Sequence, residues 1–421
     1  FFYFCPMDAA ILTIGDELLI GQVIDTNSAW LAMRLNELGF TVKARFSVGD
    51  NMSEIRDAIY YATELAPVVI TTGGLGPTSD DRTREVFCDM FECEMRENEE
   101  VLNGIKDMFA KRGWPLTDVN RRQALVPDRA KVLFNKLGTA PGLYFEDGST
   151  HIFVMPGVPF EMKEMFASAI VPHLKKVSGN QVYVHETRVF SGIGESWLSD
   201  RIKPWEEKLP ENVSLAYLPA PGIIRLRLSH LAQNEQEGRE LLRKLFAEAI
   251  PLVDEYFVTD MDEPIAATLL REMIADGKTY CTAESCTGGY IAHQITSIPG
   301  SSAAFKGSVV AYSNEIKEKL LNVSAATLQQ YGAVSSQTVC EMAANAKQIM
   351  NTDYAMAVSG IAGPDGGTAD KPVGLVWIAV ASENGVESQE LKLGGPRDVI
   401  IARSAVSAMF MCLKEKRKEK R

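Results

Sequence analysis

The sequence predicts an α/β protein in which two α/β domains with mostly parallel sheets are joined by a small α+β domain. Three observations predict it. Apolar runs of strand length alternate with helical stretches near both ends of the chain, as in sheets built from strand–helix–strand units. The middle of the chain groups its strand and helix candidates differently. The length of 421 residues suits about three domains.

The first α/β domain is expected at residues 7–176 and the α+β domain at residues 177–261. The second α/β domain is expected at residues 262–415. Apolar runs that glycine or an amphipathic helix interrupts give the strands of the first domain. Its expected strands are 9–14, 41–46, 68–70 and 152–154, and its expected helices are 27–38 and 52–64.

The other two domains follow from the same patterns. In the α+β domain we expect strands at 182–190, 214–218 and 223–231, and helices at 195–203 and 235–250. In the last domain we expect strands at 280–282, 307–312, 354–358 and 375–381, with helices between them.

Composition narrows the classes of partner. The net charge of −12 repels phosphate backbones, and no apolar run approaches the roughly 20 residues of a membrane helix. The seven cysteines form no CxxC pair, which fits free thiols in a reducing compartment. The short apolar stretch before Met7 has no basic region, so we interpret it as an upstream extension. We expect a cytoplasmic protein without nucleic-acid or membrane partners.

The most informative segment is Ala283-Glu284-Ser285-Cys286-Thr287-Gly288-Gly289. It places Ser285 where a strand gives way to a helix, and free backbone N–H groups at a helix start face incoming negative charge. A hydroxyl held there can attack a carbonyl, while the N–H groups around Cys286 and Thr287 hold the oxyanion. A serine N-cap followed by a turn at Gly288 explains the same residues without catalysis.

A second segment, Tyr312-Ser313-Asn314-Glu315-Ile316-Lys317, supplies a candidate base. Lys317 can deprotonate a serine only when its amine is neutral, and desolvation lowers the pKa of a lysine toward that state. Tyr312 can help to position it. The alternative is a solvated lysine on a charged helix. Cys286 as a thiol nucleophile is disfavoured because no histidine lies near it in the sequence.

A glycine-rich loop at residues 359–367 follows a strand of the last domain. Its Gly360, Gly363 and Gly366 suit a nucleotide phosphate or ribose, and a long structural turn is the alternative. Arg403, on the final expected helix, is a candidate phosphate partner or a surface residue.

The first domain has its own glycine loop, residues 71–81, between a strand and a helix. Asp80 and Asp81 can hold a divalent cation against a diphosphate, or they are acids favoured at a helix start. Asp16 and Glu17 follow the first strand and face the same sheet edge, where ligands of parallel sheets bind. The residues expected to hold phosphate are Gly73, Gly74, Gly76 and Thr78.

The glycine loop, residues 14–21 and Met155-Pro156-Gly157-Val158-Pro159 together resemble the molybdopterin-binding MoaB/MogA-like fold. Nearly all of residues 7–414 is similar to the CinA family, in which such a domain precedes a KH-type insert and a C-terminal domain with the 283–289 segment. Further stretches of the family pattern are 300–302, 312–314, 332–335, 359–367 and 371–374.

The resemblance implies that the C-terminal domain is a nicotinamide mononucleotide deamidase, which hydrolyses the carboxamide to a carboxylate, releases ammonia and needs no cofactor. The family's catalytic serine and lysine map onto Ser285 and Lys317. The first domain is then expected to be a metal-dependent ADP-ribose pyrophosphatase that yields AMP and ribose 5-phosphate, with Asp80 and Asp81 at the metal. The alternative is a molybdopterin-type binding module without that activity.

The resemblance also implies a homodimer, with the KH-type insert in a structural or bridging role. A KH module that binds nucleic acid clamps the backbone with a GxxG loop, and residues 181–260 contain none. A DNA-processing role, which only the family's name suggests, is therefore disfavoured.

Overall fold

The computed structural model describes residues 7–78, 81–177 and 182–418. Its contacts divide the chain into two compact units. Unit 1 is Phe1–Val184 with His230–Gly238, and unit 2 is His185–Ser229 with Arg239–Arg421. No helix in the described part of the chain has both the length and the apolar composition that crossing a membrane requires.

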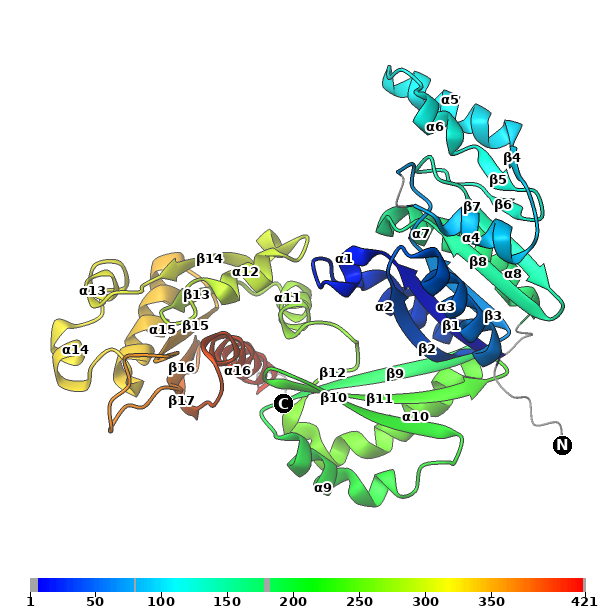
Figure 1. The fold of residues 1–421 in the computed structure, drawn as a ribbon. Helices are drawn as coiled ribbons and strands as arrows, with labels where there is room; N and C mark the ends of the chain where they lie inside the picture. The colour runs from blue at the N-terminus through cyan, green and yellow to red at the C-terminus, as the bar shows by residue number, and fades with distance from the viewer. Residues whose placement is uncertain (1–6, 79–80, 178–181, 419–421) are drawn as a thin grey trace. The chain divides into compact units, whose positions relative to one another are not determined.

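Unit 1 is built on a six-stranded sheet in the order β2-β1-β3-β8-β7-β6 (Figure 1). The first four strands in that order pair in parallel, and the last two pair antiparallel. The mostly parallel sheet predicted for this domain is therefore confirmed. The strands are β1 Met7–Ile14, β2 Phe40–Val48, β3 Val68–Thr72, β6 Lys131–Leu133, β7 Gly142–Asp147 and β8 Thr150–Met155.

Alternate side chains of β1 enter two different cores, because successive residues of a strand point to opposite faces. Ala9 and Ile11 join one core with Leu31 of α2, whereas Ala10 and Leu12 join the other with α3 and α4. Helices thus cover both faces of the sheet, as an all-buried parallel core requires. These helices are α2 Thr26–Glu37, α3 Met52–Leu65, α4 Thr83–Met90 and α7 Pro159–Met165.

An arm of unit 1 was not predicted from the sequence. The antiparallel strands β4 (Met95–Glu97) and β5 (Leu125–Pro127) carry helices α5 (Glu99–Arg112) and α6 (Asp118–Arg122) away from the sheet. A small separate core, which includes Val101, Leu102, Ile105 and Ala124, supports the arm.

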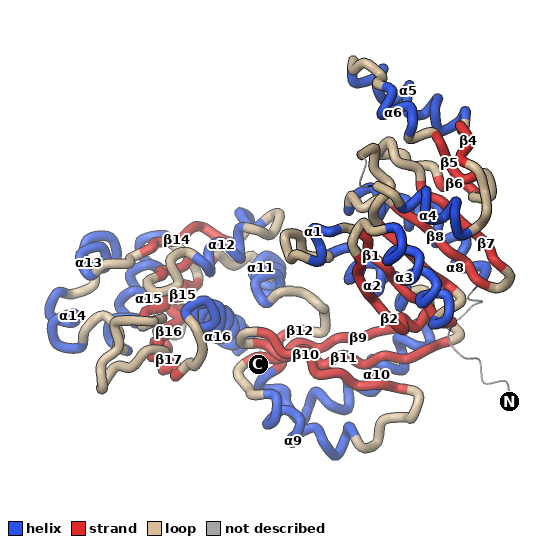
Figure 2. The backbone as a smooth tube through the Cα atoms, in the orientation of Figure 1, coloured by secondary structure: helices blue, strands red, loops and turns tan. Residues whose placement is uncertain are grey.

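The α+β domain forms a four-stranded sheet in the order β10-β11-β9-β12, with two helices (Figure 2). Its helices and first three strands match the expected KH-type insert, with somewhat longer strands, and the fourth strand, β12, was not predicted. They are β9 Val182–Ser191, α9 Glu195–Glu206, β10 Val213–Ala220, β11 Ile223–Ala232, α10 Glu235–Val253 and β12 Phe257–Thr259.

The C-terminal sheet has the order β14-β13-β15-β16-β17. Only β14, β13 and β15 are parallel; β16 and β17 form an antiparallel hairpin. The antiparallel pairing of β16 with β15 differs from the mostly parallel sheet expected here, because the loop at residues 361–374, and not a helical crossover, joins these strands. Strand β17, which follows a two-residue turn at Glu383-Asn384, was not predicted. The strands are β13 Tyr280–Glu284, β14 Phe305–Val310, β15 Tyr354–Gly360, β16 Leu375–Ser382 and β17 Gly385–Lys392.

Helices cover both faces of this sheet as well. One face packs against α11 (Ile265–Ala275), α12 (Tyr290–Thr296) and α16 (Arg397–Lys418). The opposite face packs against α13 (Asn314–Leu321) and α15 (Ser336–Met350), with α14 (Ala325–Tyr331) beside them. The carboxyl ends of β13 and β14 lie side by side, since Glu284 pairs with Val310. This edge positions the candidate site.

Candidate functional site

Ser285 is the first residue after β13, the middle one of the three parallel strands. Its N–H donates to Val358 O of β15 at 2.9 Å, and its carbonyl accepts from Gly288 N–H at 3.0 Å. The chain then turns through Gly288 and Gly289, whose φ values of 59° and 95° favour glycine. A tight strand-to-helix turn therefore fixes the Ser285 hydroxyl at the sheet edge, where its residue is only 7 % exposed.

The start of helix α12 is not open to a ligand, contrary to the expectation from the sequence. The carboxylate of Glu284, which is fully buried, accepts hydrogen bonds from the N–H groups of Gly289, Ile291 and Ala292 at 2.9–3.1 Å. A buried side chain thus supplies the negative charge that the helix start attracts. Within the described chain, the N–H groups of Cys286 and Thr287 have no such acceptor, so they remain the candidate oxyanion donors.

Lys317 lies in the first turns of α13, which Ser313 caps. Its Nζ lies 2.9 Å from Ser285 Oγ and donates to Ala311 O at 2.9 Å. The lysine is 1 % exposed. The structure therefore places it inside the site and not on a solvated face, which was the alternative from the sequence.

Burial shifts the pKa of Lys317 and of Cys286. It lowers the pKa of the Lys317 amine below its ordinary value, and no carboxylate of the described residues opposes that shift. A neutral amine has two N–H donors and one lone pair, which suits two backbone carbonyls and the Ser285 hydroxyl. Burial raises the pKa of the Cys286 thiol to about 12, so that thiol stays protonated and is a poor nucleophile.

Arg397 is a site residue that the sequence reasoning missed. It is the first residue of α16, and its guanidinium donates to Tyr312 Oη at 3.0 Å and to Gly363 O at 2.6 Å. Tyr312 is 61 % exposed, and only its carbonyl approaches Lys317 Nζ, at 3.5 Å. The tyrosine hydroxyl is thus directed to the arginine and not to the lysine. The only available signal was a lone arginine after Gly394-Gly395-Pro396, a weak one.

The glycine-rich loop after β15 contributes backbone to the same edge. Gly363, with a φ of 79°, presents the carbonyl that Arg397 contacts. The position of Gly360 leaves no room for a side chain, because a Cβ there would lie 2.6 Å from Val376. Gly366 also has a positive φ, 88°, and the loop is tied down where Lys371 donates to Tyr331 O. The structure thus supports the structural-turn interpretation and adds an anchor for Arg397.

Thr287 and Arg403 are two further candidate residues of this domain. Thr287 is 4 % exposed, and its hydroxyl has no partner among the described residues. Arg403 makes none of the site's contacts: it donates to Gly394 O and lines a different cavity. The cation of this site is Arg397.

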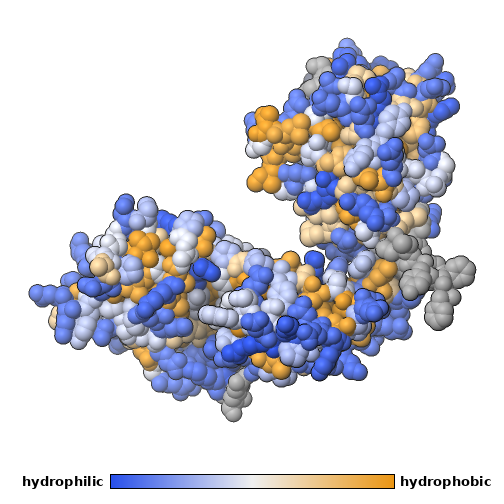
Figure 3. All heavy atoms as spheres, turned by 60° about the horizontal axis from the view of Figure 1, so that its bottom comes forward, coloured by the Kyte–Doolittle hydropathy of each residue, from blue (hydrophilic) through white to orange (hydrophobic). Residues whose placement is uncertain are grey.

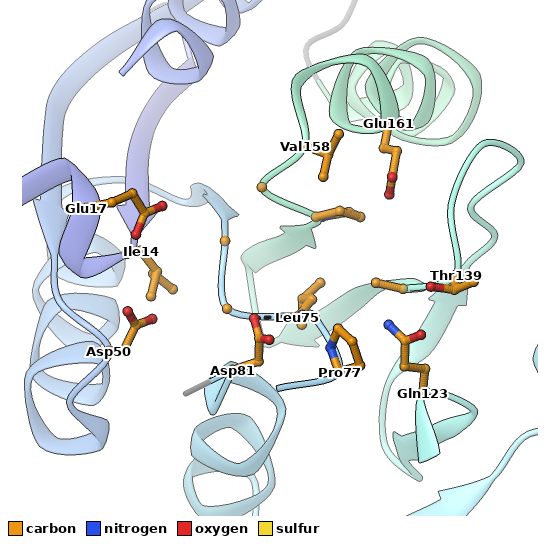
Figure 4. Close-up of a pocket in the computed structure, with 17 residues that line it drawn as sticks. Ile14, Glu17, Asp50, Leu75, Pro77, Asp81, Gln123, Thr139, Val158 and Glu161 are labelled. Carbon is orange, nitrogen blue, oxygen red and sulfur yellow. Dashed lines mark hydrogen bonds between the residues drawn. The ribbon is translucent and has the colours of Figure 1, made fainter. Parts of the chain in front are cut away.

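Unit 1 has a cavity of about 440 Å³ at the carboxyl edge of its sheet (Figure 4). The glycine loop forms its floor. A Cβ at Gly73 would lie 2.0 Å from Ile14 O, and one at Gly74 would lie 2.1 Å from Thr83 Oγ1, so both positions require glycine. Gly76 lines the cavity too. The loop expected to hold phosphate therefore does surround a cavity.

The acids of this loop are arranged differently from the expectation. Asp80 lies outside the described residues. Asp81 lines the cavity, but its carboxylate accepts from Gly76 N–H at 2.8 Å and from Thr78 N–H at 3.0 Å. Thr78 also donates its hydroxyl to Asp81. Asp16 hydrogen-bonds with Asp50 backbone and side-chain atoms and does not line the cavity.

Acids from other segments face the cavity. Figure 4 shows Glu17 and Asp50 on one side and Glu161 on another. Such hard oxygen ligands suit a divalent cation, but no three metal-binding side chains cluster in the described ranges. The metal therefore stays a prediction, and Glu17 and Asp50 are its candidate ligands among the residues that line the cavity. Asp50, Gln123, Thr139 and Glu161 were missed because distant segments bring them to the loop.

An apolar patch lies beside this cavity. Leu19, Ile20, Val23 and Ile24, in α1 (Asp16–Leu19) and the loop after it, are 49–82 % exposed. Figure 3 shows an apolar patch on the surface of unit 1. Its neighbour Glu17 lines the cavity.

Three family profiles match successive segments of the chain. A family profile described as "Probable molybdopterin binding domain" matches residues 10–176, "Damage-inducible protein CinA KH domain" matches 185–258, and "CinA C-terminal domain" matches 262–416. A CinA-like protein of Cytophaga hutchinsonii is 40 % identical over 404 residues, which is 95 % of this chain and 96 % of that protein.

A protein of Acetivibrio thermocellus described as "Putative competence-damage inducible protein" is 40 % identical over 405 residues, covering 96 % of this chain and 98 % of its own. Among solved structures, a competence/damage inducible protein of Agrobacterium tumefaciens is 40 % identical. That structure covers 37 % of this chain and 98 % of its own, with a TM-score of 0.35.

Proposed function

This chain belongs to the CinA family, and from that premise we propose that its C-terminal domain is an amidohydrolase that deamidates nicotinamide mononucleotide. The observation that carries the proposal is the 2.9 Å approach of Lys317 Nζ to Ser285 Oγ in a buried setting that lowers the pKa of the lysine. A serine with a neutral amine beside it is an activated nucleophile.

The reaction follows from this pair. The neutral Lys317 amine takes the proton of Ser285 Oγ as that oxygen attacks the carboxamide carbon. The N–H groups of Cys286 and Thr287 stabilise the oxyanion. The Lys317 ammonium then returns its proton to the departing nitrogen, ammonia leaves, and an acyl-enzyme remains. The again neutral Lys317 takes a proton from a water molecule as that water attacks the ester, and the lysine then returns the proton to Ser285 Oγ as the carboxylate product leaves.

Arg397 supports the choice of an anionic substrate. Its guanidinium is exposed, held by Tyr312 Oη and Gly363 O, and without a carboxylate partner among the described ion pairs. An arginine so oriented keeps donors for a phosphate. Glu284 has already filled the start of α12, so a mononucleotide phosphate is better placed at Arg397.

An ammonia-release assay with nicotinamide mononucleotide tests the proposal. Ser285→Ala removes the nucleophile, and Lys317→Arg introduces a permanent cation and cannot supply a neutral amine because an arginine stays protonated. Both should lower kcat by about a thousandfold or more, whereas the matched exposed variant Lys319→Arg should keep wild-type activity. A Ser285→Ala protein that is as active as the wild type would falsify the nucleophile assignment.

For unit 1 we propose a metal-dependent ADP-ribose pyrophosphatase. The cavity with its glycine loop and carboxylates supports diphosphate binding. A divalent ion, once bound, would neutralise charge on the diphosphate. Glu17 and Asp50 would hold it, and the N–H groups of the loop would orient the phosphates.

AMP release from ADP-ribose, measured with several divalent metals, tests this second proposal. Glu17→Gln and Asp50→Asn should each lower the rate by about a hundredfold and leave ammonia release by the other unit unchanged. A protein that releases no AMP but copurifies with a fluorescent pterin supports the molybdopterin-type binding module instead.

A further inference from the structure

A second cavity, of about 1030 Å³, lies within unit 2 and shares no lining residue with the Ser285 site. Its walls are the turn at Gly192–Glu195, the turn between β10 and β11, strand β17 and one face of α16. Ligand cavities are commonly about 300–1000 Å³, so this volume accommodates a mononucleotide with solvent. Neither the family comparisons nor the sequence analysis assigns a role to it.

Specific contacts build the cavity. Gly192 and Gly222 both have positive φ, 79° and 80°, and a Cβ on them would lie 3.3 Å from Phe410 and 3.0 Å from Val406 of α16. Ser191 Oγ donates to Gly222 O at 2.8 Å and thereby ties the two turns together. Glycine at both turns lets them approach α16 closely, so the walls are fixed relative to one another.

The α16 wall carries cations without carboxylate partners. Arg403 and Lys414 both line the cavity, lie on the same helix face and are in none of the described ion pairs, and the carboxylate near Lys414 is that of Glu255, whose pKa the charge of the lysine helps to lower. Lys414 instead lies over the Phe410 ring, at 5.5 Å. Lys418, by contrast, pairs with Glu387 at 2.7 Å. In a chain of net charge −12, two unpaired cations in a cavity favour an anionic ligand.

The facing wall carries an aromatic ring and an acid. Trp197 lines the cavity with its residue 69 % exposed. An exposed tryptophan is a stacking surface for a planar ring. Glu195, at the start of α9, also lines the cavity. A carboxylate there can accept hydrogen bonds from sugar hydroxyls, as acids do in nucleotide sites.

We propose that this cavity is a second ligand site that binds a nucleoside monophosphate, with the phosphate at Arg403 and Lys414 and the base against Trp197. A nucleic acid strand fits less well, because Glu195, Glu387 and Glu415 line the cavity. Those acids would repel a run of phosphates.

Photolabelling of the full chain with 8-azido-AMP, followed by peptide mapping, locates the bound probe. We expect saturable labelling of peptides that contain Gly192–Trp197 or residues 403–418, with AMP competing and adenosine competing at least about tenfold less well. Labelling confined to other peptides, or adenosine competing as well as AMP, contradicts the proposal. A short single-stranded RNA that competes better than AMP also contradicts it.

Two variants sharpen the test. Ser407→Trp fills the cavity from α16, and Arg403→Glu reverses the exposed cation; each should reduce labelling of these peptides at least about tenfold. Lys319→Glu, a matched reversal on α13, should change nothing. Unchanged labelling in Arg403→Glu overturns the proposal even if the tryptophan variant fails to fold, and ammonia release by Ser407→Trp at the wild-type rate shows that it has folded.

Discussion

The Ser285 turn and the unit 1 glycine loop both contain a side-chain carboxylate that accepts hydrogen bonds from backbone N–H groups, but the two carboxylates differ in burial. Each places a side-chain carboxylate on free backbone N–H groups: Glu284 on the start of α12, and Asp81 on the N–H groups of Gly76 and Thr78. Glu284 is fully buried, whereas Asp81 is partly exposed at a cavity wall. The first carboxylate is a permanent part of the fold, and the second lies where an incoming phosphate can replace it.

This difference separates two kinds of anion chemistry. In the C-terminal domain Glu284 already satisfies the helix start, so we propose Arg397 as the separate cation for the charge of the substrate. In unit 1 the loop keeps N–H groups near a cavity and acids around it, which suits a diphosphate with a metal. Substitutions of Lys317, Arg397 and Glu284 test that contrast.

The largest effect is expected from Lys317→Met, which removes the base and keeps the shape of the side chain. Deamidation should fall about a thousandfold or more, while AMP release by unit 1 stays the same. Parallel ammonia and AMP assays on one preparation measure both. Equal losses of the two activities would contradict the separation of the sites.

Arg397→Ala should act mainly on substrate binding. It removes a charge-assisted contact from an exposed position, so KM for nicotinamide mononucleotide should rise about tenfold or more, with a smaller change in kcat. Arg403→Ala is the matched control on the same helix and should leave KM unchanged. Steady-state kinetics distinguish the two, and the reverse pattern would place the phosphate at Arg403.

Glu284→Ala should destabilise the C-terminal domain. Three backbone N–H groups lose their acceptor, and one unsatisfied buried donor costs about 1–3 kcal/mol, so we expect a loss of at least about 2 kcal/mol in the free energy of unfolding. Asp81→Ala, in a partly exposed loop, should cost about 1 kcal/mol or less. Denaturant unfolding of both variants measures the difference; equal losses would remove the contrast between the two carboxylates.

The smallest effect concerns the pH dependence of stability. The pKa of Lys317 is lower in the folded state than in the unfolded chain, so the unfolded chain binds more protons and the folded state gains stability as pH rises toward the ordinary lysine pKa. Relative to Lys317→Met, the wild type should lose at most about 1.4 kcal/mol per pH unit as pH falls over that window. A difference that does not change with pH would mean that the lysine is charged when folded.

Local patterns predicted most of the strands and the turn at Ser285, because each depends on residues close in sequence, whereas the pairing of Ser285 with Lys317, 32 residues apart, was expected only from the family resemblance. The motifs at 283–289 and 312–317 sit at the ends of adjacent parallel strands, so pairing of β13 with β14 brings them together. The arm carrying α5 and α6 and the exposed strand β17 were missed, since polar strands and short helices leave little periodicity.

The role of Arg397 could not be predicted because it depends on tertiary geometry. Arg397 lies 85 residues after Tyr312 in the sequence, and it reaches that tyrosine only because α16 begins beside the loop after β15. Glu284 was overlooked because the helix start was assumed to be open. Asp50 and Glu161 likewise reach the unit 1 cavity only through the order of strands in the sheet.

The most direct test of the account is the protonation of Lys317 itself. An NMR titration of lysine ε-methylene carbons, with Lys317→Met to assign the signal, reads its pKa in the folded protein. We expect a pKa below the ordinary lysine value and an ammonia-release rate that falls as pH drops through that same pKa. A Lys317 signal that titrates at the ordinary value, with a pH–rate profile unrelated to it, would contradict the Ser285–Lys317 mechanism.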